Sequence, residues 1–112
     1  MKTVKVSEGN YIDYSVSKTK ITFNDELMLN VVKYERDFPV TIDVCIDKFG
    51  AVTTGLGMKY AAQIEIPERK YTETEIQNPD YNPEDEQSRP TIIKKDPVPF
   101  SMENVVLKLY AI

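Results

Sequence analysis

The chain contains no histidine and only one cysteine among its 112 residues. Histidine is the commonest general base, the usual partner of a serine or cysteine nucleophile, and the commonest metal ligand. The single Cys45 can form neither an internal disulfide nor a thiolate metal cage. We therefore expect a protein that is not an enzyme and that carries no metal or other cofactor.

A surplus of basic residues is also missing, because 14 Lys and Arg stand against 18 Asp and Glu. The net charge of -4 has the wrong sign for binding nucleic-acid phosphates or an anionic membrane surface. The longest stretch without a charged residue, 49–58, is much shorter than the roughly 20 apolar residues of a spanning helix. The N-terminal residues lack the apolar segment of a secretion signal. We expect no nucleic-acid or membrane partner, and a location in the cytoplasm or in a virion.

Alternation of apolar and polar residues dominates positions 10–66 and predicts short β-strands. The clearest run is 40–47, in which every even-numbered residue from Val40 to Ile46 is apolar. Turn-forming residues separate the runs at Ser17–Lys20, Asn24-Asp25 and Asp47–Gly50. The predicted core consists of Ile12, Tyr14, Ile21, Phe23, Leu29, Val31, Val40, Ile42, Val44, Ile46, Ile64, Ile66, Leu107 and Leu109.

Two segments are less regular. Residues 26–35 show apolar spacing that fits either a strand or a helix, and adjacent valines favour the strand. Residues 71–76 predict a polar edge strand after Pro67, which ends the strand before it.

Composition changes sharply over residues 77–100, which hold five of the seven prolines and no glycine. A segment of this length without regular structure is uncommon inside a compact domain and is usually functional or disordered. We interpret 77–100 as a Pro-rich, acidic arm. Tyr81, which lies in the arm without a strand to explain it, is a candidate contact residue.

The arm is followed by an apolar C-terminal strand, predicted over 103–112. Left exposed, such a strand invites aggregation, so it must pair with a sheet of the same chain or of a neighbouring chain. An extended arm reaches up to roughly 80 Å, and pairing in trans would give a homo-oligomer by strand exchange. The candidate interaction residues at this end are Pro97, Pro99, Phe100, Val105, Leu107 and Leu109.

Three further patterns have both a functional and a structural interpretation. Asp43, Cys45 and Asp47 share one strand face, as a carboxylate site would require, but we interpret this face as solvent-exposed. Gly55-Leu56-Gly57 begins like a dinucleotide-binding motif whose third glycine is replaced by Tyr60, so we expect a hairpin tip or bulge. The acidic run Glu84, Asp85 and Glu86 either imitates the phosphates of a nucleic acid or is a solvated loop.

These patterns predict one all-β domain over 1–112: an antiparallel sandwich or small open barrel of 6–8 short strands, with a long Pro-rich loop before the last strand. The predicted function is that of a non-catalytic structural or assembly module that binds protein through β-edge pairing and the arm. Small β domains with exchanged arms are common among phage and other virion components, and by this analogy of architecture we predict a phage or mobile-element structural component. The alternatives are an acidic inhibitor that mimics nucleic acid, and a carbohydrate- or small-ligand-binding module that uses Phe49, Tyr60 or Tyr81.

Overall fold

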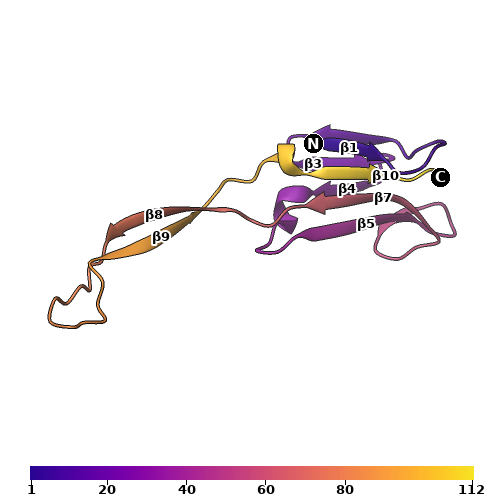
Figure 1. Ribbon diagram of the computed structural model, residues 1–112. Coiled ribbons are helices and arrows are strands. Elements are labelled where there is room, and N and C mark those ends of the chain that lie inside the picture. Colours follow the sequence, from indigo (N-terminus) through magenta and orange to yellow (C-terminus); the bar gives the residue numbers. More distant parts are fainter. The chain divides into compact units, whose positions relative to one another are not determined.

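The computed structural model describes residues 1–112 and contains ten strands and two short 3₁₀ helices (Figure 1). Strands make up 46% of the chain, which confirms the all-β class. The ten strands exceed the predicted 6–8, because the short strands at 2–5 and 52–54 and the exposed strand at 91–97 were not recognised from the sequence. The chain divides into two units, residues 1–68 with 100–112, and residues 69–99. No helix is long and apolar enough to cross a membrane.

The first unit contains two sheets. The larger sheet has the order β1-β10-β7-β5-β6, in which only the β1–β10 pair is parallel. Its strands are β1 (Lys2–Lys5), β5 (Val40–Ile46), β6 (Val52–Thr54), β7 (Lys59–Ile66) and β10 (Val106–Leu109). The smaller sheet is antiparallel and consists of β2 (Tyr14–Ser17), β3 (Lys20–Phe23) and β4 (Leu27–Asn30).

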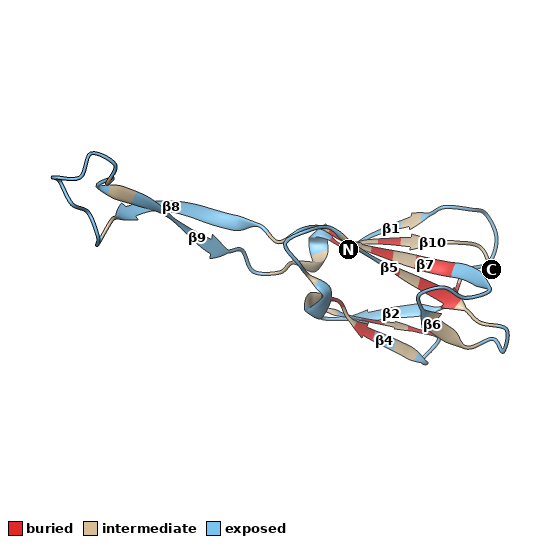
Figure 2. Cartoon of the chain, turned by 90° about the horizontal axis from the view of Figure 1, so that it is seen from below, coloured by how far each residue is buried: buried red, intermediate tan, exposed pale blue.

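Buried residues, red in Figure 2, lie on strands of both sheets of the first unit. Their side chains form one hydrophobic core. The predicted core residues are buried, except that Val40 and Ile46 are partly buried and Tyr14 is 38% exposed. Tyr14 lies on the edge strand β2, which has no buried residue. Ala61 and Ala62 are both buried, where a register shift between β5 and β7 interrupts the alternation.

The last strand, β10, lies between β1 and β7 of its own chain. Backbone bonds from Lys2 N to Val105 O (2.9 Å) and from Val6 N to Leu109 O (2.8 Å) extend its pairing with β1. The strand is shorter than the predicted 103–112, because the 3₁₀ helix η2 (Met102–Asn104) precedes it. In the single chain, the pairing predicted for this strand is therefore made in cis.

The predicted turns occur at the expected positions. Asn24 and Asp25 have positive φ angles of 52° and 54°, and Gly50 has a φ of 80° after the Asp47 turn. The ambiguous segment 26–35 contains both kinds of structure, since strand β4 ends at Asn30 and the 3₁₀ helix η1 (Val31–Tyr34) follows it.

The second unit is a β-hairpin, formed by β8 (Tyr71–Gln77) and β9 (Thr91–Pro97). The polar strand predicted at 71–76 is confirmed as β8. The prediction of an arm without regular structure over 77–100 needs correction, because residues 91–97 pair with β8 and only 78–90 form a loop. Strand β9 escaped detection because neither of its faces is buried, so its sequence carries no alternation.

Candidate interaction surface

The hairpin ladder has a defined phase, which means that the structure determines which residues bond to the partner strand. β8 and β9 pair from Tyr71 with Pro97 to Gln77 with Thr91. Just beyond the two ends, Val98 N donates to Lys70 O (2.8 Å) and Asn78 N donates to Pro90 O (2.9 Å). Because hydrogen-bonded and non-hydrogen-bonded pairs alternate in an antiparallel ladder, the even-numbered residues of both strands carry the bonds between them.

The odd-numbered residues of the hairpin therefore direct their backbone N–H and C=O groups outward, away from the partner strand. On the β8 edge these residues are Tyr71, Glu73, Glu75 and Gln77, and on the β9 edge they are Thr91, Ile93, Lys95 and Pro97. The same phase explains how a proline fits in a strand. The nitrogen of Pro97 faces outward, so its missing N–H removes no bond from the hairpin.

Both faces of the hairpin are open. Every residue of β8 is exposed, as is every residue of β9 except Thr91. Ile76 and Ile92 lie opposite each other and are 37% and 41% exposed, while Ile93 on the other face is 63% exposed. A two-stranded ribbon of this kind buries no core and is marginally stable on its own.

Charge differs between the two edges. The outward-facing residues of β8 include Glu73 and Glu75, whereas the charged outward-facing residue of β9 is Lys95. Across the hairpin, Lys95 Nζ lies 3.7 Å from Glu73 Oε1, and Thr91 Oγ1 donates to Glu75 Oε1 at 2.5 Å. The Lys95–Glu73 pair is solvent-exposed and contributes at most about 1 kcal/mol, so it gives the hairpin little rigidity.

The loop over 78–90 holds Tyr81 and the acidic run. Asn78 Oδ1 accepts from Asp80 N (3.0 Å), and Asn82 Oδ1 accepts from Glu84 N (3.0 Å), so two asparagine turns shape the loop. Asp85 Oδ1 accepts from Gln87 N at 2.9 Å. Tyr81 is 44% exposed, and Glu84, Asp85 and Glu86 are exposed.

The remaining predicted interaction residues are divided between the units. Pro97 and Pro99 belong to the hairpin unit. Phe100 packs against the core of the first unit, in which Val105, Leu107 and Leu109 are 0%, 0% and 3% exposed. In the single chain these apolar residues stabilise the core and offer no surface to a partner.

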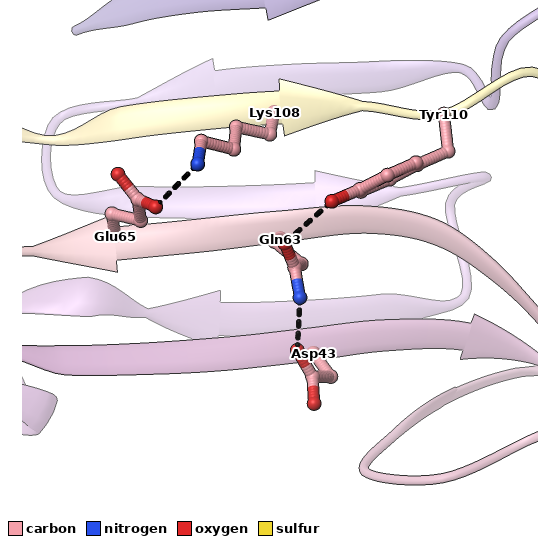
Figure 3. A network of polar contacts seen from close by, with 5 residues as sticks. All are labelled: Asp43, Gln63, Glu65, Lys108 and Tyr110. Carbon is pink, nitrogen blue, oxygen red and sulfur yellow. Dashed lines mark hydrogen bonds and ion pairs between the residues drawn. The ribbon is translucent and has the colours of Figure 1, made fainter. Parts of the chain in front are cut away.

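A polar network that the sequence did not reveal crosses the outer face of β5, β7 and β10 (Figure 3). Gln63 Nε2 donates to Asp43 Oδ1 (2.8 Å), and Tyr110 OH donates to Gln63 Oε1 (2.6 Å). Lys108 Nζ lies 2.7 Å from Glu65 Oε1, and this hydrogen bond and the carboxylate charge raise the pKa of Lys108. These three contacts join β5, β7 and β10 across the sheet.

The strand face of Asp43, Cys45 and Asp47 has structural roles. Cys45 is 1% exposed because the loop at Gly57 covers it, which corrects the expectation of a solvent-exposed face. A Cβ atom on Gly57 would lie 2.7 Å from the Cys45 Cβ, so the close approach requires glycine. Asp47 Oδ1 accepts from the backbone N–H groups of Phe49 (2.8 Å) and Ala51 (2.9 Å) and shapes the turn.

The glycine motif and the exposed aromatic residues do not come together in one site. Gly55 and Gly57 lie in the connection from β6 to β7, and the element that follows is a strand. Phe49 and Tyr60 belong to the first unit and Tyr81 to the second. A hollow of about 380 Å³ is lined by Ile46, Asp47, Lys48, Gly50, Met58 and Lys59.

Comparison of the chain with protein-family models, curated proteins and solved structures finds no match. Among the features described above, the hairpin combines outward-facing backbone groups on two edges with exposed isoleucines on both faces. This combination is suited to the addition of a further strand.

Proposed function

We propose that the protein is a non-catalytic assembly module that binds a protein partner by strand addition to the β8–β9 hairpin. The observation that carries the proposal is the exposed two-stranded ribbon with outward-facing backbone groups along both edges. A third strand would pair these groups and cover exposed isoleucine side chains. The first unit, which we propose to class as a β-sandwich because its two sheets share one core, serves as the carrier of the ribbon.

Strand length favours the hairpin over the other sheet edges as the binding surface. The edge strands of the first unit, β1, β2, β4 and β6, have three or four residues each, whereas β8 and β9 have seven. Very short edge strands are one of the ways in which proteins prevent unwanted pairing. A long edge that is left open is consistent with a surface that is meant to pair.

The hairpin also changes how the arm contributes to assembly. The bond from Val98 N to Lys70 O holds the two ends of the segment together at 2.8 Å, so the segment is no free tether. While the seven-residue ladder stays closed, only the short connections outside the hairpin are left to carry β10 to another chain. We therefore place the partner contact on the hairpin edges and leave β10 in the sheet of its own chain.

A photoreactive amino acid in place of Lys95, introduced in cells that naturally make the protein, tests the proposal. Lys95 lies on an outward-facing position of β9, so irradiation should link it to a protein. Lys48, which is exposed in the turn between β5 and β6, is the matched control and should give no such adduct. Equal adducts at both positions, or none at either, would contradict strand addition at the hairpin.

A further inference from the structure

We infer that the strand added at the β9 edge is β9 of a second copy of this chain, paired antiparallel about a two-fold axis at Ile93. The inference rests on the proposed function and specifies its partner. It follows from the phase of the ladder and from the charges on the two edges of the hairpin.

Pairing of two β8 edges is unfavourable. The central outward-facing residues of β8 are Glu73 and Glu75. A two-fold axis at Glu73 or at Glu75 places a glutamate opposite its own copy, and an axis at Thr74 places Glu73 opposite Glu75. Like charges directly opposite each other destabilise a strand pair, so pairing centred on the middle of this edge is disfavoured.

Pairing of two β9 edges has no such conflict. With the axis at Ile93, Ile93 lies opposite its own copy and Thr91 lies opposite Lys95 of the copy. These residues direct their N–H and C=O groups outward, so the facing pairs can exchange backbone hydrogen bonds. Pro97, which lacks an N–H donor, falls outside this paired run and removes no bond.

The resulting four-stranded sheet covers apolar surface and is more stable than the isolated hairpin. Ile93, now 63% exposed, would pack against its copy, and a sheet of three or more strands is far more stable than a single hairpin. The pairing is isologous and closes at the dimer. Its two outer edges would be the β8 strands, whose glutamates oppose further growth.

The alternative contact between copies joins the β8 edge of one chain to the β9 edge of the next. Glu73 would then face Lys95, which is favourable, but the contact is heterologous and leaves both ends open. Such pairing gives a series of increasing masses in place of a dimer. Mass as a function of concentration therefore separates the two arrangements.

Charge complementation at position 93 is the direct test of the two-fold axis. In Ile93→Lys or in Ile93→Glu, each homodimer would place like charges opposite each other, so either variant alone should be largely monomeric. An equal mixture should form a heterodimer, because opposite charges then meet at the axis. Light scattering after size-exclusion chromatography gives the masses, with the wild-type chain expected to be a dimer.

A proline pair provides the second test. Ile93→Pro removes an outward-facing N–H of β9, and Glu75→Pro removes one from the β8 edge, while the ladder between the strands keeps its bonds. We expect Ile93→Pro to be a monomer and Glu75→Pro to remain a dimer. Hydrogen exchange at the Ile92 amide verifies that the hairpin is intact in both variants.

The inference is overturned if the wild-type chain is a monomer at all concentrations, if Ile93→Pro remains a dimer, or if the mixture of charged variants does not associate. Masses that keep increasing with concentration would show that the copies associate through the heterologous β8–β9 contact and not through the two-fold β9–β9 pairing. A monomer whose position 95 links to a different protein in cells would overturn the second copy as partner but retain the proposed function. A monomer without any adduct would overturn both.

Discussion

At the scale of single residues, the ion pair between Lys108 and Glu65 couples the two strands on which these residues lie. The pair is partly exposed, with side-chain exposures of 33% and 41%. Glu65 raises the pKa of Lys108 above its ordinary value of 10.5, mainly through the hydrogen bond. A raised pKa in the folded state means that the pair stabilises the fold while Lys108 is protonated.

This ion pair predicts a specific pH dependence. Its stabilising contribution is fully present below pH 10.5 and is lost as the pH rises through the raised pKa of Lys108. The difference in thermal unfolding midpoint between the wild-type chain and Glu65→Gln should therefore be constant from neutral pH up to this pH and shrink above it. Glu8→Gln, at an exposed position, serves as the control and should show no such change. A difference in unfolding midpoint that grows with alkaline pH would contradict a raised pKa of Lys108.

The sequence could place these residues only in part. Alternation correctly put Asp43 and Cys45 on one strand face, because side chains two apart point the same way. It did not reveal that Gly57 covers Cys45 or that Gln63 bonds to Asp43, because these contacts join residues well apart in the chain. The strand order in space determines such contacts, and no local pattern encodes it.

At the scale of elements, the hydrogen-bond phase of the hairpin gives the neighbouring residues Ile92 and Ile93 different roles. The N–H of Ile92 bonds to β8, whereas that of Ile93 faces outward. Ile92→Pro should therefore remove a ladder hydrogen bond, worth about 1 kcal/mol, and open this marginally stable hairpin, while Ile93→Pro should leave the hairpin formed. Hydrogen exchange of the β8 amides measures the difference. Equal loss of protection in both variants would show that the assignment of even-numbered residues to the hydrogen bonds between β8 and β9 is wrong.

The strands were predictable to the degree that they have one buried face. Strand β5 was read correctly because Ile42 and Val44 point into the core, while Thr41 and Asp43 do not. Strand β9 was missed because Ile92 and Ile93 are neighbours on opposite faces and both are exposed. A hairpin without a core has no reason to alternate, so its pairing became visible only in the structure.

At the scale of the whole molecule, the stability of the first unit depends on β10. Leu107 is fully buried in the middle of this strand, whereas Leu56 is 88% exposed in the connection between β6 and β7. We expect Leu107→Ala to lower the free energy of unfolding by about 2–5 kcal/mol and Leu56→Ala to change it by less than about 0.5 kcal/mol. Denaturant titration measures both. A small effect at Leu107 would contradict its place in the core.

The overall class was predictable and the connectivity was not. Leu107 and Leu109 were expected in the core from their alternation, and both are buried there. Their parallel pairing with β1 joins opposite ends of the sequence, as in the register of Thr3 with Leu107. Composition and periodicity are local properties, so they indicate that β10 is a strand without indicating its neighbours.

The hairpin has a consequence for the way in which the chain folds. Strand β7 ends at Ile66 and β10 begins at Val106, so a long insertion separates two strands that must meet. Bringing the ends of a flexible loop together costs entropy that increases with its length. A hairpin closes in roughly microseconds from local contacts, and once closed it shortens the free loop to a few residues on either side. Closure of the ribbon therefore lowers the entropy cost of pairing β7 with β10.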